Sequence, residues 1–179
     1  MMKLCWFYGG LLIIFVLSCV SAVVNVKNGG FESGSNQPDF WFTYKSPGTD
    51  AVFVWDNKVF HNGKYSVYIK NNGPKNAAWQ TSIPVKGGAT YLIKVWAKVK
   101  NGKGVTRIGL RCEDAVGNWT GQVIEGTGIS GDKDWTEIFL HARVPEKAAR
   151  ARIFLVNSAG SGDEIWFDDV TVEETEEKK

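Results

Sequence analysis

Charged and aromatic side chains alternate with apolar ones in two segments of the chain. The first segment reads VTRIGLRCE (105–113) and the second reads ARARIFLV (149–156). Neighbouring side chains of a β-strand point to opposite faces, so the apolar residues of each segment share one buried face. The opposite face then carries Arg107, Gly109, Arg111, Glu113, Arg150, Arg152 and Phe154. These groups can form ordinary solvated ion pairs, or they can bind the hydroxyl and acidic groups of a polar ligand.

Tryptophan is abundant, and one tryptophan stands in a polar setting. Seven follow the first 22 residues: Trp41, Trp55, Trp79, Trp96, Trp119, Trp135 and Trp166. Trp119 belongs to AVGNWTGQ (115–122), a Gly-flanked stretch that we expect to be a loop with little core to fill. An exposed aromatic plane can stack on the apolar face of a pyranose ring, whose hydroxyl rim needs paired donors and acceptors. This combination favours a carbohydrate ligand.

Two adjacent aspartates interrupt the apolar segment EIWFDDVTVEE (164–174). Strict alternation predicts that Asp168 shares the inward face of Val170 and Val172. A bare buried carboxylate is costly, so a partner that offsets its charge is expected.

The elements that must position these residues are strands. Nearly every segment after residue 22 alternates with period two, and the segments are separated by stretches rich in Gly, Asn, Asp and Pro. No segment has the period of an amphipathic helix. The pattern predicts an all-β fold, either an antiparallel β-sandwich or a barrel.

The first 22 residues have the layout of a secretory signal: Lys3, an apolar run from Leu11 to Leu17, and small residues up to Ala22. The apolar run is shorter than the roughly 20 residues of a spanning helix. Lipid attachment at Cys19, which would anchor the protein to the cell surface, remains an alternative. We expect a secreted protein with a signal at 1–22, one domain at 23–173 and a flexible charged tail at 174–179.

Charge and cysteine content narrow the possible partners. Removing Lys3 with the signal leaves 20 basic against 19 acidic residues, which does not indicate nucleic acid or an acidic membrane as partner. Only Cys112 remains after the signal, so no internal disulfide can form, and a bound metal is one other source of rigidity.

The chain resembles the calcium-containing jelly-roll carbohydrate-binding modules of families four, nine, sixteen and twenty-two. The resemblance runs in order through NGGFESG, PDFWFTY, HNGKYSVYI, GATYLIKVWAKV, DWTEIFLHARVP and IWFDDVTV. It implies an antiparallel β-sandwich of the jelly-roll, galactose-binding-like kind. It also implies a non-catalytic, monomeric domain that binds a polysaccharide or oligosaccharide in a cleft on one sheet. It further implies that Trp41 is a core residue and that Tyr44 and Trp119 are stacking platforms.

The sugar-binding residues that the resemblance implies are Tyr44, Gln80, Arg107, Arg111, Glu113, Trp119, Arg150 and Phe154. Some relatives carry Gln or Asn where this chain has Arg or Glu. The usual neutral glucan ligand is therefore in question, and substituted or acidic polysaccharides come into consideration.

The resemblance also implies one structural Ca²⁺. The matching ligands are the side chains of Glu32 and Asp168 and backbone carbonyls near Gly30 and Lys64, with Asp169 as an alternative to Asp168. Calcium takes six to eight oxygen ligands, which carboxylates and carbonyls from several segments can supply.

Two other functions stay open at this point. A structural or adhesive cell-surface domain could use the same exposed aromatics to hold a protein partner. A glycan-degrading enzyme would need two carboxylates, for which Glu113 and Glu137 are available without a motif that links them. His61 and His141 have no Ser or Cys partner at a recognisable spacing, so we expect no catalysis.

Overall fold

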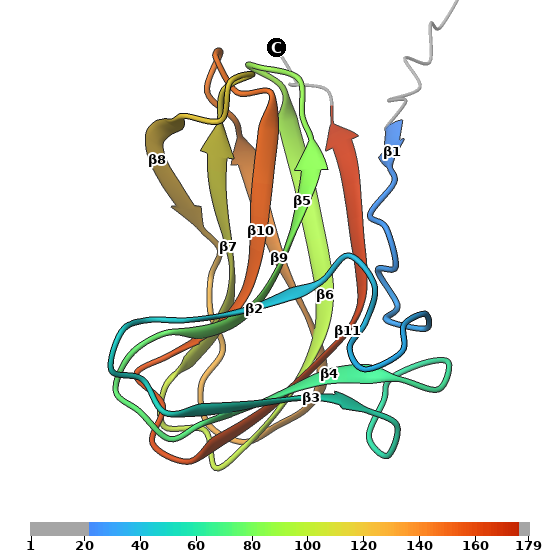
Figure 1. Ribbon diagram of the computed structural model, residues 1–179, viewed down its shortest axis with the longest axis vertical. Coiled ribbons are helices and arrows are strands. Elements are labelled where there is room, and N and C mark those ends of the chain that lie inside the picture. The colour runs from blue at the N-terminus through green and yellow to red at the C-terminus, as the bar shows by residue number, and fades with distance from the viewer. Residues whose placement is uncertain (1–21, 176–179) are drawn as a thin grey trace, which may run out of the picture.

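The computed structural model describes residues 22–175, and these residues form two stacked antiparallel sheets with no helix among them (Figure 1). The eleven strands are β1 (Ala22–Val24), β2 (Phe42–Lys45), β3 (Ala51–Asp56), β4 (Ser66–Asn71), β5 (Ala77–Pro84), β6 (Thr90–Lys100), β7 (Val105–Glu113), β8 (Trp119–Glu125), β9 (Lys133–Arg143), β10 (Arg150–Ser158) and β11 (Asp163–Thr175). The predicted all-β sandwich is confirmed. Within the described part, no helix is long and apolar enough to cross a membrane.

One sheet has six strands and the other has five. The six-stranded sheet has the order β3-β4-β11-β6-β9, and β1 pairs with the second half of β11. The five-stranded sheet has the order β2-β5-β10-β7-β8. Because β10 is hydrogen-bonded to both β5 and β7, residues that are far apart in the sequence lie side by side on this sheet.

The core lies between the two sheets and contains the residues that alternation assigns inward. Ile108, Leu110 and Cys112 of β7 are buried, as are Ala151, Ile153 and Leu155 of β10. Trp41 is also fully buried, and its indole N–H donates to the backbone oxygen of Asn28 at 3.0 Å. This satisfied donor makes Trp41 a core residue, as expected.

A polar cluster is buried where β4 and β10 end and where β7 and β11 begin. Asn71, Thr106, Asn157 and Asp163 are all buried and are joined by side-chain hydrogen bonds. Burial acts to raise the pKa of Asp163, but N–H donors from Lys103, Gly104, Ser161 and Asn157 outweigh burial and hold the pKa below its ordinary value.

A bulge in β11 corrects the predicted direction of Asp168. The pairing with β6 shifts between Asp168 and Thr171, and Asp169 has a positive φ of 53°. Before the bulge Asp168 lies opposite Trp96, whose side chain is on the outer face of the sheet, whereas Val170 and Val172 after the bulge face the core. Asp168 is indeed fully buried, but it is covered by residues 61 and 62 and does not point into the core.

The expected boundaries at the two chain ends can be compared only in part. Residues 1–21, where the signal is expected, and 176–179 of the expected tail lie outside the described residues. Ala22 pairs with Glu174, and Thr175 pairs with Thr90, so β11 extends two residues into the segment that we expected to be a tail.

Candidate functional site

The outer face of the five-stranded sheet gathers the predicted ligand-binding residues into rows that cross the strands. One row consists of Pro84, Arg150, Glu113 and Trp119, and the next consists of Ser82, Arg152, Arg111 and Val123. A central row consists of Phe42, Gln80, Phe154, Gly109 and Glu125, followed by Tyr44, Ala78, Val156 and Arg107. All eight predicted sugar-binding residues therefore occupy one face.

A cleft of about 230 Å³ lies over the middle rows of this face. Its lining residues are Tyr44, Asn76, Gln80, Gly109, Arg111, Val123, Glu125, Arg152, Phe154 and Val156. Gly109 occupies the floor between Phe154 and Glu125, and a Cβ placed there would have only the Cβ of Phe154 as a neighbour, at 3.7 Å. The missing side chain thus keeps the centre of the cleft open.

Aromatic side chains stand at two places on the face. Tyr44 and Phe154 meet edge to face with ring centroids 5.9 Å apart, and Tyr44 is 40% exposed. Trp119 is 52% exposed, and the Arg111 guanidinium lies 5.3 Å from the centre of its ring. Trp119 is the first residue of β8 and not part of a loop, so a strand fixes its backbone. Both places offer an apolar plane to a ligand.

Ion pairs hold three of the four arginines on this face. Arg152 lies 3.0 Å and Arg150 lies 3.9 Å from the carboxylate of Glu113, whose side chain is only 12% exposed. Arg107 lies 2.8 Å from Glu125 and also donates to the hydroxyl of Ser158. Glu113 and Glu125 therefore have electrostatic partners that orient the arginines around the cleft.

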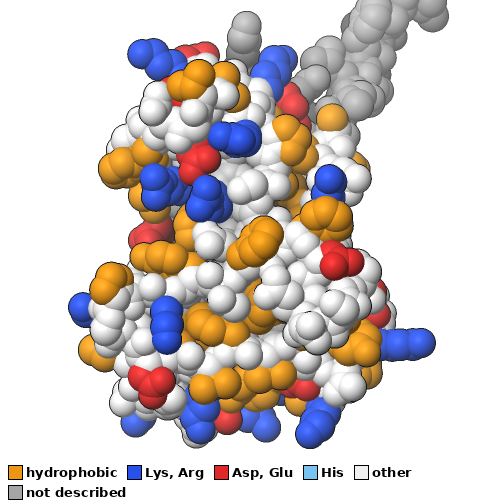
Figure 2. All heavy atoms as spheres, in the orientation of Figure 1, with side chains coloured by type: hydrophobic (Ala, Val, Ile, Leu, Met, Phe, Trp, Pro, Cys, Tyr) orange, Lys and Arg blue, Asp and Glu red, His pale blue; other side chains and the backbone are white. Residues whose placement is uncertain are grey.

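Figure 2 views the molecule from the side of this sheet, with basic, acidic and apolar side chains adjacent to one another over β7, β8 and β10.

Of the eight predicted sugar-binding residues, four line the cleft itself: Tyr44, Gln80, Arg111 and Phe154. Arg107 adjoins it through Glu125, whereas Glu113, Trp119 and Arg150 form the row beyond it.

Six lining residues were absent from the predicted set: Asn76, Gly109, Val123, Glu125, Arg152 and Val156. Alternation already placed Gly109 and Arg152 on the outward face. The alternation of apolar residues could not predict that β10 pairs with both β5 and β7. This pairing determines which outward residues lie next to one another in the cleft.

The predicted metal ligands lie on the other sheet, around the turn that contains residues 61–65. The backbone N–H groups of His61 and Asn62 donate to Asp168 Oδ2 at 2.9 and 3.1 Å. Those of Lys64 and Tyr65 donate to Glu32 Oε1 at 2.9 and 3.1 Å. The two carboxylates thus bind the same turn from two ends of the chain.

Burial raises the pKa of Asp168 to about 6, against the opposing effect of its backbone N–H donors and with a further increase from the neighbouring charge of Asp169. Ion pairs to lysine or arginine are absent from both Glu32 and Asp168 in the described part of the chain. A cation beside Asp168 would favour its charged form.

The donor chemistry at this turn suits calcium, because both side chains offer hard oxygen ligands. Gly63 leaves room for Glu32, since a Cβ at Gly63 would lie 2.2 Å from Oε1. No group of three or more His, Cys, Asp or Glu is placed to hold a metal among residues 22–175. Backbone carbonyls, such as those near Gly30 and Lys64, would therefore have to supply the remaining ligands.

The carboxylates considered for hydrolysis are not brought together. Glu113 lies on the five-stranded sheet, whereas Glu137 lies on β9 of the six-stranded sheet opposite Trp96. His61 lies in the turn between β3 and β4, where its ring stacks on Trp96 of the six-stranded sheet at 4.1 Å and its Nδ1 lies 2.7 Å from Asp169. Glu113 and Glu137 cannot flank one glycosidic bond.

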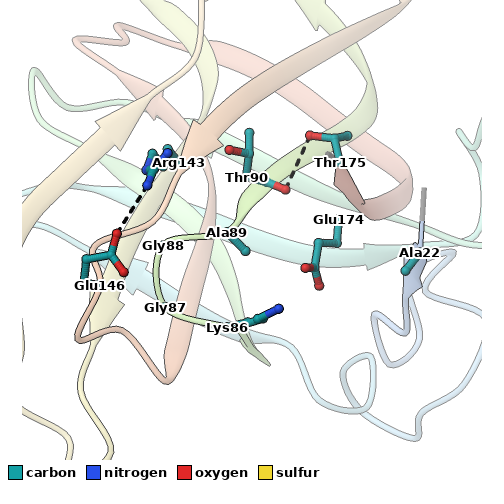
Figure 3. Close-up of a pocket in the computed structure, with 10 residues that line it drawn as sticks. All are labelled: Ala22, Lys86, Gly87, Gly88, Ala89, Thr90, Arg143, Glu146, Glu174 and Thr175. Atoms are coloured by element: carbon teal, nitrogen blue, oxygen red, sulfur yellow. Dashed lines mark hydrogen bonds and ion pairs between the residues drawn. The ribbon is translucent and has the colours of Figure 1, made fainter. Parts of the chain in front are cut away.

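A second cavity of about 350 Å³ lies at the end of the sandwich where β1 and β11 meet the turn at residues 86–89 (Figure 3). Its described lining contains the Arg143–Glu146 ion pair and two glycines but no aromatic side chain. The smaller cleft, with its aromatic planes and convergent polar groups, is therefore the candidate binding site.

Comparisons with known proteins identify the family and the fold of the chain. Residues 24–161 match the family model described as a carbohydrate binding domain. No curated protein matches the chain. Three solved structures show the same fold at low sequence identity, and at such identities the likeness establishes the fold alone.

The CBM22-1 xylan-binding domain of Paenibacillus barcinonensis Xyn10C has a TM-score of 0.65 at 13% identity, covering 89% of this chain and 98% of that domain. TmCBM61, solved with β-1,4-galactotriose, has a TM-score of 0.51 at 22% identity, covering 83% and 97%. The enzymatically active domain of tailspike protein 4 of bacteriophage CBA120 has a TM-score of 0.61 at 22% identity. The match covers 84% of this chain but only 21% of the tailspike chain.

Proposed function

Because the chain belongs to this family of carbohydrate-binding domains, we propose that it is a secreted, non-catalytic module that binds a polysaccharide chain in the cleft of the five-stranded sheet. The observation that carries the proposal is the central row, in which Gln80, Phe154 and Gly109 lie side by side beneath Tyr44. A sugar ring needs an apolar plane and nearby hydrogen-bonding groups, and this row with its neighbours supplies both.

The roles of the cleft residues follow from their chemistry. Tyr44 and Phe154 present ring surfaces to the apolar face of a sugar, and Trp119 extends this contact at the far row. Gln80 and Arg111 donate hydrogen bonds to hydroxyl oxygens. Glu113 positions Arg150 and Arg152 through its ion pairs.

Affinity electrophoresis against glucans, xylans, mannans, galactans and uronic-acid polymers tests this function. We expect retardation by at least one polymer and weaker retardation for Phe154→Ala. The control is Phe139→Ala, which removes a 58% exposed phenylalanine from the other sheet and should bind as the wild type does. Absence of retardation by every polymer would contradict the proposal, and release of reducing sugar would contradict its non-catalytic part.

We also propose that calcium binds at Glu32 and Asp168 and stabilises the fold away from the cleft. The support is the fully buried Asp168 carboxylate, which has no cationic side chain beside it, and the shared turn at residues 61–65. The ion would offset the charge of Asp168 and tie the first segments of the domain to β11.

A ligand that binds only the native state raises its stability, so a chelator should lower the Tm of the wild type. Asp168→Asn should abolish this chelator effect, while Asp134→Asn, which changes an exposed aspartate of β9, should keep it. An unchanged Tm in metal-depleted protein, verified by elemental analysis, would refute the calcium site.

Secretion has its own test. Export from an expressing cell with cleavage after Ala22 is expected, and the mass of the exported protein measures it. A mature chain that begins at a lipid-modified Cys19 would instead show attachment to the cell surface.

A further inference from the structure

Positive charge is concentrated on the face that contains the cleft. Its rows hold four arginines, Arg107, Arg111, Arg150 and Arg152, against two glutamates, Glu113 and Glu125. Without the expected signal and its Lys3 the formal charge of the chain is +1, so the charges elsewhere sum to −1. The excess is thus a property of this face and not of the protein in general.

Arg111 is the arginine that the protein itself does not neutralise. Its guanidinium lies over Trp119, and it has no carboxylate partner and no hydrogen-bond acceptor within residues 22–175. This cation–π contact restrains the guanidinium group and leaves its N–H donors available to a ligand.

Arg152 lies directly opposite Arg111 on the neighbouring strand. Like charges at directly opposed positions of an antiparallel pair destabilise the sheet. Arg152 is ion-paired to Glu113 at 3.0 Å, and its side chain is still 37% exposed. Both arginines line the cleft, so an anion between them would relieve the repulsion and accept hydrogen bonds from their exposed guanidinium groups.

We propose that the cleft selects polysaccharides with anionic sugar units, whose carboxylate or sulfate group binds between Arg111 and Arg152. The inference rests on the proposed function, since it assumes that a sugar chain occupies this cleft. The anionic group then defines the register of the chain, with adjacent sugar rings over Phe154 and Tyr44 on one side and Trp119 on the other.

Pairs of polymers that differ only in charge test the proposal. Polygalacturonate is compared with its fully methyl-esterified form, and dextran sulfate with dextran, by affinity electrophoresis and calorimetry. The wild type should bind at least one charged member about tenfold or more tightly than its neutral counterpart, as expected from one charge-assisted hydrogen bond. The first pair reports a carboxylate and the second a sulfate.

Arg111→Gln should remove this preference, because Arg111 is exposed and its loss leaves the core unchanged. The matched control is Arg143→Gln, the same charge change at an exposed arginine of β9 on the other sheet. An equal loss in both variants would show general charge attraction and overturn the proposal. Equal binding of charged and neutral members would overturn this inference while leaving sugar binding intact, whereas no binding to any polymer would contradict the proposed function itself.

Discussion

Gly109 on the floor of the cleft allows a substitution in which stability and binding should change in opposite directions. Glycine in the interior of a strand is less favourable than alanine by about 0.5–1 kcal/mol, because its backbone loses more freedom on folding. A Cβ at this position would meet only the Cβ of Phe154 at 3.7 Å, an ordinary van der Waals distance, and Gly109 is not among the positive-φ glycines. We therefore expect Gly109→Ala to raise the free energy of unfolding by about 0.5–1 kcal/mol, or the Tm by roughly 1–4 °C.

Affinity should fall in the same variant. The new methyl group lies in the central row between Phe154 and Glu125, where it separates a bound sugar from the cleft floor. Gly109→Leu fills more of the 230 Å³ cleft and should remove one aromatic stacking contact. By analogy with base stacking on aromatic side chains, that contact contributes about 1–3 kcal/mol, or roughly a five- to 150-fold change in Kd.

Calorimetric titration and thermal unfolding of both variants measure the two effects separately. Gly126→Ala is the contrasting control, since a Cβ there would lie 2.7 Å from the backbone oxygen of Phe139 and should lower the Tm without a direct effect on the cleft. Folded Gly109→Leu protein with wild-type affinity would refute the assignment of this cleft as the binding site.

Three further predictions concern the core. Asp163→Asn should cost about 2 kcal/mol at neutral pH, because N–H donors lose a charged acceptor. The pKa of Asp163 is lowered in the folded state, so the stability that its charged form contributes is present above its ordinary pKa and is lost as pH falls through the folded-state pKa. In urea unfolding, the difference in free energy between variant and wild type should therefore be smaller at pH 3 than at pH 7. Cys112 is buried, and burial raises the pKa of its thiol. Iodoacetamide should therefore label Cys112 in denaturant and not in the native protein. Rapid labelling of the native protein would contradict the position of Cys112 in the core. Trp41→Ala should lower the free energy of unfolding by about 3–5 kcal/mol in a denaturant titration, and a loss under 1 kcal/mol would show that Trp41 is not a core anchor.

Strand alternation was sufficient to predict the faces of β7 and β10 in the five-stranded sheet. In β7 and β10 the apolar residues are buried and the arginines are outward, because each strand has one face on the core and no bulge interrupts the pairing of these two strands. This regularity is why Arg111 and Phe154 could be placed in a candidate site before their distance was known. The same pattern could not show that Gly109 lies beside Phe154, because strand order depends on contacts between distant segments.

The prediction failed at β11, where regular alternation does not hold. Asp169 adopts a positive φ and forms part of the bulge, so the residues on either side of it exchange faces. The turn at residues 61–65 then covers Asp168 from outside the sheet. A bulge stabilised by such a distant segment leaves no local signal in the pattern of apolar residues. The apolar residues around Asp168 were nevertheless sufficient to predict that its carboxylate is buried and needs a partner.

The pairing of β1 with β11 determines how the domain responds to mechanical load. Val23 and Glu173 are direct neighbours, so tension between the two ends of the domain breaks the short β1 ladder one hydrogen bond at a time. β11 keeps β4 and β6 as neighbours, and the backbone oxygen of Gly29 still accepts from the N–H of Val170 after β1 detaches. Residues 23–28 then supply roughly 20 Å of extension before the sandwich is loaded. The segment before Gly29 can therefore lengthen under load while the sheet that holds the cleft stays folded.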